Sequence, residues 1–265
     1  MVHKEFSYMQ RGKHVRPLEA SELALLGPID QRGKGKDRAL LALHGFSSTP
    51  AVFRLLLPKL QQYDAIVSPL LSGPELGIKA LANSKASDWL NTSIKACAEL
   101  CQNYKQVDVL GLSLGGLLAC ELSKIYSLNH LYLLAPALKL HLKVKACLKV
   151  AKILQSLGIY SLKNKAGNLV TSEHAEIAPR RIPLSIIIEM LQYNLNYQWI
   201  VPKCPVDVFL GVQDAVVASD QVAKMFADAP NAKIHWLDNS AHVLPLDNDF
   251  DAIAACITEN YATKL

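Results

Sequence analysis

Short apolar runs alternate along the chain with longer segments in which apolar residues recur every three or four positions. The runs lie at 38–43, 65–67, 107–110, 131–135, 206–211 and 233–237. Runs of this length, bounded by turn residues, are typical of strands buried on both faces. Helical periodicity is seen at 50–60, 88–100 and 114–122, and after 242 up to about 261. Strands that alternate with helices predict an α/β fold whose mostly parallel central sheet is flanked by helices.

The alternation breaks between 138 and 202. Helical patterns at 140–157 and 183–195 are separated by a polar loop at 163–181, and Gly158 marks the end of the first helix. Two helices inserted between strands predict a small cap over the sheet, although ordinary crossover helices fit the same pattern. We therefore expect a core at 38–137 and 203–265, and a helical cap insertion at 138–202.

Residues 1–37 precede the first apolar run. They are polar, with turn signals at Gly27-Pro28 and at Gly33 to Lys36, and a short helical pattern covers 18–26. We treat them as an N-terminal arm, to which the sequence assigns no function.

The pattern Gly-Leu-Ser-Leu-Gly at 111–115 lies where the apolar run at 107–110 meets a helical pattern. A serine on such a strand-to-helix turn adopts a strained backbone and projects above the sheet edge. That geometry requires residues without side chains two positions before and after the serine, and Gly111 and Gly115 meet the requirement. A glycine-rich helix start without chemistry would show the same five residues, so Ser113 needs partners elsewhere.

An acid and a histidine follow two later strands. Asp214 lies in the loop after 206–211, and His242 lies in the loop after 233–237. The carboxyl ends of parallel strands gather at one edge of a sheet, so these side chains are expected to meet Ser113 there. A serine hydroxyl needs a base, and a histidine needs a carboxylate that fixes its tautomer. The sequence thus predicts a catalytic triad of Ser113, His242 and Asp214.

Two backbone N–H groups are candidates for an oxyanion hole. The run at 38–43 ends at His44-Gly45-Phe46, in a loop beside the serine turn, and the N–H of Phe46 can face a developing oxyanion from there. The second donor is the N–H of Leu114, the residue after the nucleophile.

Other acids and histidines fit the triad less well. Asp207, Asp220 and His235 lie within strand or helix patterns, where side chains are usually structural. His174 lies in the polar loop of the cap, and Asp238 lies shortly before His242. His130 and His141 border a strand and a helix without an acid nearby.

Composition limits the class of protein. The 265 residues, 51% of them apolar, suit one large domain or one domain with an insertion. The start of the chain carries charges where a signal peptide needs an apolar core, and no apolar run approaches the ~18 residues of a membrane span. The six cysteines lack the spacing of a zinc site and mostly lie in apolar patterns. We expect a soluble, cytoplasmic protein whose cysteines are reduced.

Charge is concentrated in the cap. The formal net charge is +5, but residues 139–181 alone contain nine basic and two acidic residues. A solvated lysine face explains such a segment, and so does attraction of an anionic substrate, an acidic protein or an anionic lipid surface. Nucleic acid fits poorly, because aromatic residues are not interleaved with the lysines.

Several stretches resemble the α/β-hydrolase superfamily, and within it the small bacterial carboxylesterases related to monoacylglycerol lipases. They span roughly residues 38–262 and include Leu41 to Phe46 with Pro50 and Arg54, Gly111 to Gly116, Gly211 to Val217, and Ser240 to Asp247. The resemblance implies a mostly parallel sheet with a small helical cap, a serine nucleophile, and ester hydrolysis through an acyl-enzyme. It implies no metal and no organic cofactor.

The expected function is hydrolysis of a small carboxylic ester, with a short to medium acyl group or a monoacylglycerol-like structure. An acyltransferase or amide hydrolase would use the same triad, and a non-catalytic small-molecule binder would use the pocket under the cap. Two departures from the family pattern leave the catalytic groups in place: Leu71-Ser72-Gly73 replaces a Gly-His-Gly turn, and Ala241 replaces a glycine before the histidine. The first lies in a loop near the cap, so the substrate preference of the family does not carry over.

Overall fold

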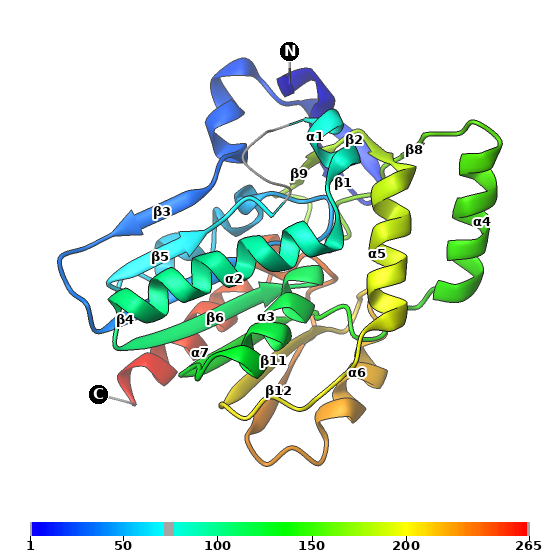
Figure 1. Cartoon of the computed structure of the whole chain (residues 1–265). Coiled ribbons are helices and arrows are strands. Elements are labelled where there is room, and N and C mark those ends of the chain that lie inside the picture. The colour runs from blue at the N-terminus through cyan, green and yellow to red at the C-terminus, as the bar shows by residue number, and fades with distance from the viewer. Residues whose placement is uncertain (1, 72–76, 264–265) are drawn as a thin grey trace.

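The centre of the molecule is a seven-stranded sheet in a computed structural model that describes residues 2–71 and 77–263 (Figure 1). The strand order is β12-β11-β7-β6-β4-β5-β3, in which the first six strands are parallel and β3 runs antiparallel to β5. The strands are β3 (Ile29–Arg32), β4 (Arg38–Leu43), β5 (Ala65–Ser68), β6 (Gln106–Leu112), β7 (His130–Leu134), β11 (Val206–Gly211) and β12 (Ala232–Leu237). The mostly parallel sheet predicted from the apolar runs is confirmed.

Helices cover both faces of the sheet. One face packs against α2 (Ala86–Asn103), α3 (Leu114–Ile125) and α6 (Ser219–Phe226). The other face packs against α7 (Phe250–Ala262) and the short 3-10 helices η3 (Pro50–Phe53), η4 (Leu57–Lys59) and η5 (Leu244–Leu246). All residues of β4, β7 and β11 are buried, which explains why these strands appear in the sequence as continuous apolar runs.

The parallel register brings the carboxyl ends of the strands to one edge. Gly111 of β6 pairs with Leu133 of β7, and Gly211 of β11 pairs with Leu237 of β12. The loops that follow β4, β6, β11 and β12 therefore leave the sheet on the same side.

The segment between β7 and β11 forms the cap over this edge. Its helices α4 (Val144–Ser156) and α5 (Leu184–Asn196) pack against each other through apolar side chains and stand beside the sheet in Figure 1. Between the helices lie the short strands β8 (Ser161–Lys163), β9 (Glu176–Pro179) and β10 (Arg181–Pro183). A further helix, α1 (Ile78–Asn83), contacts α5 and β10.

The N-terminal residues are attached to the cap. After the 3-10 helix η1 (Val2–Glu5), β1 (Phe6–Gln10) and β2 (Lys13–Pro17) form a hairpin, and η2 (Ala20–Leu26) follows. The turn residues Arg11 and Gly12 both have positive φ, as a tight two-residue hairpin requires. β1 also pairs with β9, so the hairpin adds to a three-stranded sheet whose third strand comes from the cap.

The structure differs from the sequence-based expectation in several places. The helix expected at 50–60 is two 3-10 turns, because Pro58 lacks the N–H that an α-helix needs and collides with the preceding turn. The loop expected at 163–181 contains β9, which is stabilised by pairing with β1. The arm expected at 1–37 contains β3, which extends the central sheet. The departure at Ser72 and Gly73 lies outside the described residues.

Within residues 2–71 and 77–263, no helix combines the length and the apolar character needed to cross a membrane. The six cysteines are free thiols. Cys97 and Cys101 share one face of α2 with their sulfur atoms 4.0 Å apart.

Candidate active site

Ser113 lies at a strained turn between β6 and α3. Its φ of 53° and ψ of −111° are in a region that side chains rarely adopt. The turn is compact because a Cβ on Gly111 would collide with the backbone of Gly115, and a Cβ on Gly115 would collide with the carbonyl of Leu43. The two glycines that the sequence predicted as necessary are therefore required by the packing.

The hydroxyl of Ser113 faces His242, and His242 faces Asp214. The Oγ of Ser113 lies 3.0 Å from the Nε2 of His242, and the Nδ1 of His242 lies 2.8 Å from the Oδ2 of Asp214. The three residues follow β6, β12 and β11, so the parallel strands bring together positions 113, 214 and 242 from distant parts of the chain. A serine, a base and an acid in this order can activate the hydroxyl as a nucleophile.

The acid is held in a fixed orientation. The Oδ1 of Asp214 accepts the backbone N–H groups of Val216 at 2.7 Å and Val217 at 2.8 Å, which leaves Oδ2 for the imidazole. Burial alone would raise the pKa of Asp214, but the facing His242 and these N–H groups hold it below the usual value. Asp214 is therefore a carboxylate at neutral pH.

The same pair sets the charge of the histidine. Burial would lower the pKa of His242, but the carboxylate of Asp214, with a smaller contribution from Glu176, raises it above its ordinary value. The imidazole is therefore well suited to accept a proton from the serine hydroxyl.

The loop after β4 runs directly against the serine. A Cβ on Gly45 would lie 3.5 Å from the Cβ of Ser113, and Phe46 lines the same cleft as Ser113. Ser47 in this loop has a φ of 55°, a second strained residue beside the turn. Leu114 is the first residue of α3, so its N–H has no acceptor within the helix. Both predicted oxyanion-hole residues thus adjoin Ser113.

His44 is a structural residue that sequence reasoning did not identify. Its Nδ1 donates to the carbonyl of Gly45 at 2.9 Å, and its Nε2 accepts the N–H of Leu71 at 3.1 Å. Burial lowers the pKa of His44 to about 4, so the ring is neutral and can make both bonds. The sequence feature that could have indicated this role is the position of His44 directly before Gly45-Phe46. His44 fixes the backbone from which the N–H of Phe46 extends.

The cap contributes Asn168, which sequence reasoning also missed. Its carbonyl accepts the N–H of His242 at 3.1 Å and of Val243 at 3.2 Å, and its Oδ1 accepts the N–H of Ala215 at 3.0 Å. One cap residue therefore bridges the loops of the histidine and the acid. No local sequence pattern marks it, because these contacts join segments far apart in the chain.

Asp247 ties the histidine loop to the cap segment that follows Asn168. Its buried carboxylate accepts the N–H groups of Ala241 at 2.8 Å, Val170 at 2.9 Å and Thr171 at 2.9 Å. Ala241, which stands where the family pattern has glycine, has no positive φ, so an alanine fits there without strain.

A cleft of about 390 Å³ lies above Ser113 and His242, between the core and the cap. Its lining is mostly apolar and includes Leu140, Leu142, Ile182, Ile187, Met190, Leu191 and Val216. The lining also includes the polar or charged residues Asn164, Lys165, Asn168 and Glu176. A volume of this size suits a small molecule with an apolar and a polar end.

None of the competing histidines and acids lines this cleft. The expectation that His130 has no acid nearby is wrong: its Nε2 lies 2.6 Å from the Oδ2 of Asp207. His235 contacts the Oδ1 of the same carboxylate at 2.6 Å. Both histidines reach Asp207 because their strands, β7 and β12, flank β11. Burial would raise the pKa of Asp207, but the two histidines hold it far below its usual value.

Among the described residues, Asp207, His235 and Cys256 form a group of three side chains of metal-ligating types, whose ligand atoms lie within 4.8 Å of one another. They lie toward the amino end of β11, away from Ser113.

A seven-stranded, mostly parallel sheet with helices on both faces and a serine on the turn after a central strand is the α/β-hydrolase fold. The chain belongs to the uncharacterised protein family UPF0227, whose family model matches residues 39–245.

Sequence and structure comparisons find hydrolases of this fold. A carboxylesterase of Bacillus subtilis (strain 168) is 20% identical over 224 residues, which are 83% of this chain and 90% of that enzyme. A structure from work on the metagenome-derived lipolytic enzymes LipS and LipT has a TM-score of 0.79 at 22% identity, over 88% of this chain and 96% of that one. A soluble variant of the monoglyceride lipase of Saccharomyces cerevisiae, with a substrate analog, has a TM-score of 0.68 at 15% identity, over 90% and 92%.

Proposed function

We propose that this protein is a serine hydrolase that cleaves carboxylic esters through an acyl-enzyme intermediate. The observation that carries the proposal is the continuous chain of contacts from Ser113 through His242 to Asp214 at the base of a cleft. The similarity to a carboxylesterase, and the shared fold of lipolytic enzymes, support the same reaction class.

The proposed reaction has two halves. As the Oγ of Ser113 bonds to the ester carbonyl carbon, its proton passes to the Nε2 of His242, and the oxyanion is bound by the N–H groups of Phe46 and Leu114. The charged imidazole is stabilised by Asp214 and then donates its proton to the leaving alcohol, whose bond to carbon breaks. A water molecule repeats the sequence on the acyl-enzyme, releases the acid and restores the serine.

The mixed lining of the cleft suggests the substrate class. A mostly apolar lining that also contains a few polar and charged side chains fits an ester with an acyl chain and a polar alcohol. A short to medium acyl ester or a monoacylglycerol-like ester has this form, and two of the structural neighbours are named as monoacylglycerol or monoglyceride lipases.

The test is hydrolysis of p-nitrophenyl esters from acetyl to long acyl by the wild type, Ser113→Ala and a matched control. Ser123→Ala suits as the control, because Ser123 also lies on α3 but only bonds the carbonyl of Cys120. We expect turnover by the wild type and the control, and loss of nearly all turnover in Ser113→Ala. Activity retained by Ser113→Ala would contradict the proposal.

Acyl transfer and amide hydrolysis are the alternative reactions, because they share the acyl-enzyme. Adding a primary alcohol or an amine to the ester assay separates them: a transferase forms a new ester or amide in place of the free acid. A non-catalytic binder would give no turnover on any ester and no covalent labelling of Ser113 by a fluorophosphonate.

We further propose that the cap contacts anionic lipid. The outer face of α4 and the segment after it expose apolar side chains, with Leu157 72% and Tyr160 74% exposed, beside Val150 and Ile153. Exposed lysines at 145, 149 and 152 lie on the same helix. An apolar strip flanked by lysines is typical of a helix that lies at a membrane surface.

Co-sedimentation with liposomes tests this contact. We expect more protein bound to vesicles containing anionic lipid than to neutral vesicles, and reduced binding by a variant with Lys145, Lys149 and Lys152 changed to Gln. Binding that is indifferent to lipid charge would contradict the proposal.

We propose a cytoplasmic location as well. Six free thiols, two of them 4.0 Å apart on α2, fit a reducing compartment. Cell fractionation followed by immunodetection tests the location.

A further inference from the structure

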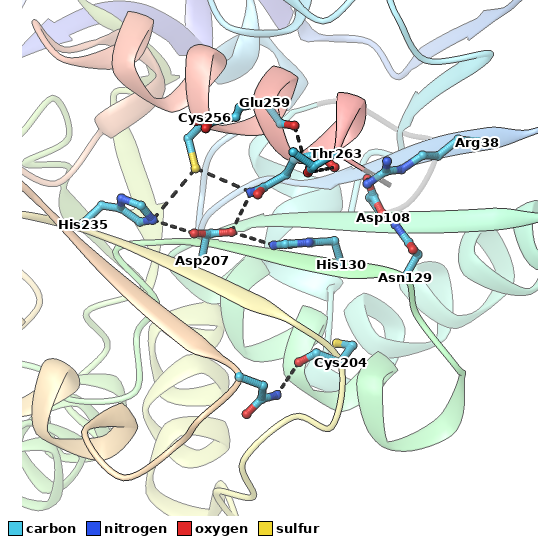
Figure 2. A network of polar contacts seen from close by, with 12 residues as sticks. Arg38, Asp108, Asn129, His130, Cys204, Asp207, His235, Cys256, Glu259 and Thr263 are labelled. Carbon is cyan, nitrogen blue, oxygen red and sulfur yellow. Dashed lines mark hydrogen bonds and ion pairs between the residues drawn. The ribbon is translucent and has the colours of Figure 1, made fainter. Parts of the chain in front are cut away.

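The polar cluster around Asp207 joins three elements of the core. Asp207 lies in β11, His235 in β12 and Cys256 in α7 (Figure 2). The Nε2 of His235 lies 2.6 Å from the Oδ1 of Asp207 and 3.9 Å from the Sγ of Cys256. One ligand atom from each residue lies within 4.8 Å of the other two.

We propose that Asp207, His235 and Cys256 form a binding site for a divalent transition-metal ion of the Zn²⁺ type. Imidazole nitrogen, carboxylate oxygen and thiolate sulfur are the three ligand types that Zn²⁺ takes in proteins. The site is independent of the ester chemistry proposed above.

The distances suit an ion after a small adjustment. Tetrahedral Zn²⁺ holds such atoms about 3.3 to 3.6 Å apart, which follows from bond lengths of about 2.0 to 2.3 Å. The present separations of 2.6 and 3.9 Å lie on either side of that range. The carboxylate must therefore withdraw from the ring by less than about 1 Å, and the sulfur must approach the ring and stay within reach of the carboxylate oxygen, since the three ligand atoms now lie within 4.8 Å of one another.

The carboxylate already has outer partners that would orient it on an ion. Its second oxygen, Oδ2, is contacted by His130 Nε2 at 2.6 Å and by Asn260 Nδ2 at 2.8 Å. Oδ1 is therefore the oxygen directed at His235 and available for an ion. Partners of this kind fix ligand orientation in known metal sites.

The ring of His235 is also fixed, and the site is accessible. Phe209 stacks on the ring with centroids 4.6 Å apart. The His235 side chain is 31% exposed and Cys256 is half-buried, so an ion can enter from solvent, which also supplies a fourth ligand. On binding, the Cys256 thiol releases its proton to solvent and the neutral ring carries its proton on Nδ1.

The site would join α7 to the two strands before it. β12 and α7 flank the loop that carries His242, and β11 precedes the loop that carries Asp214. A bound ion would therefore hold together the elements from which both loops extend, without contacting the residues in them.

Cobalt binding tests the proposal with the full chain, purified without a histidine tag. Tetrahedral Co²⁺ with a thiolate ligand gives a charge-transfer band and visible d–d bands, and Zn²⁺ should displace it. We expect saturation at one Co²⁺ per chain. The same three side chains also satisfy one another without an ion, so wild-type protein without these bands would overturn the proposal.

Two variants and a control assign the ligands. Cys256→Ser should lose the thiolate band and bind Co²⁺ at least about 10-fold more weakly. His235→Gln keeps an N–H for Asp207 but should also bind weakly. Cys147→Ser, which changes a half-buried cysteine in α4, should match the wild type. A thiolate band that persists in Cys256→Ser would overturn the assignment.

Thermal unfolding gives an independent measurement. Saturating Zn²⁺ should raise the unfolding midpoint of the wild type and Cys147→Ser by about 5 °C, because the ion binds the folded chain. It should not raise that of Cys256→Ser. Equal shifts in Cys256→Ser and Cys147→Ser would again contradict the site.

Discussion

The backbone carbonyl of Asn168, a cap residue, accepts the N–H of His242 at 3.1 Å. The Asn168 side chain reaches in the other direction, to the N–H of Ala215 beside Asp214, at 3.0 Å. The cap is therefore part of the framework that positions the histidine and the acid, as well as a cover for the cleft.

Asn168→Ala should lower kcat for p-nitrophenyl esters about 3- to 10-fold, which corresponds to the loss of one hydrogen bond. KM should change little if the effect acts through the position of Asp214. Asn103→Ala, at the exposed end of α2, is the control and should behave as the wild type. An unchanged kcat in Asn168→Ala would mean that its side chain does not position the acid.

The pH dependence of kcat/KM should reflect His242. In the proposed mechanism the neutral imidazole is the base, so activity should fall as the pH drops through its pKa. Because Asp214 raises that pKa, the acid limb should have its midpoint above the ordinary value of 6.5. A midpoint below 6.5 would contradict this account of the pair.

Asp214→Asn should move that limb to lower pH, because the charge that raises the pKa is removed while burial still lowers it. Turnover should also fall about 10⁴-fold, since the amide favours the wrong tautomer of the ring. The pH dependence of fluorophosphonate labelling measures the shift where turnover is too slow. A limb that does not move would show that another group sets it.

Gly115→Ala should destabilise the fold by about 3 kcal/mol or more, because the new Cβ collides with the carbonyl of Leu43. Gly158→Ala is the matched control. Gly158 has a left-handed backbone, with a φ of 83°, which an alanine adopts only with strain. Nothing lies within 4 Å of a Cβ there, so the substitution should cost about 1 kcal/mol. Urea denaturation measures both, and equal costs would contradict the role of the collision.

The parts of the fold and site that the sequence predicted depend on local patterns. Apolar runs mark the buried parallel strands, and the ends of such strands must meet at one edge. Ser113, Asp214 and His242 each lie in the turn or loop after a strand, so their meeting could be predicted without knowledge of side-chain packing. Pro58 was also a local signal: a proline at this position disfavours a continuous α-helix over 50–60, and the apolar periodicity there did not outweigh it.

The parts that the sequence did not predict depend on contacts between distant segments. β9 has four residues and exists because β1 pairs with it. Asn168 reaches the loops of His242 and Asp214 only because the cap folds back onto the core. Asp207, His235 and Cys256 come from three elements, so no spacing of ligands along the chain could reveal their proximity.

The buried ion pair of Arg38 and Asp108 lies far from Ser113, so a substitution in it should change stability and leave activity unaffected. The Nε and Nη2 of Arg38 lie 2.8 and 2.7 Å from the Oδ2 of Asp108, which is fully buried. Both residues lie near the amino ends of their strands, β4 and β6. Ser113 lies five residues after Asp108, which is roughly 16 Å at the rise of a strand.

Arg38→Met should therefore lower the free energy of unfolding by about 3 to 5 kcal/mol, because the carboxylate of Asp108 remains buried without its counter-charge. Below the unfolding transition, kcat/KM should stay close to that of the wild type. Asp108→Leu combined with Arg38→Met should recover part of the loss, since no unpaired charge remains. Urea denaturation and ester assays at low temperature measure the two quantities. A loss of kcat/KM in folded Arg38→Met would instead indicate that the pair influences the distant serine turn.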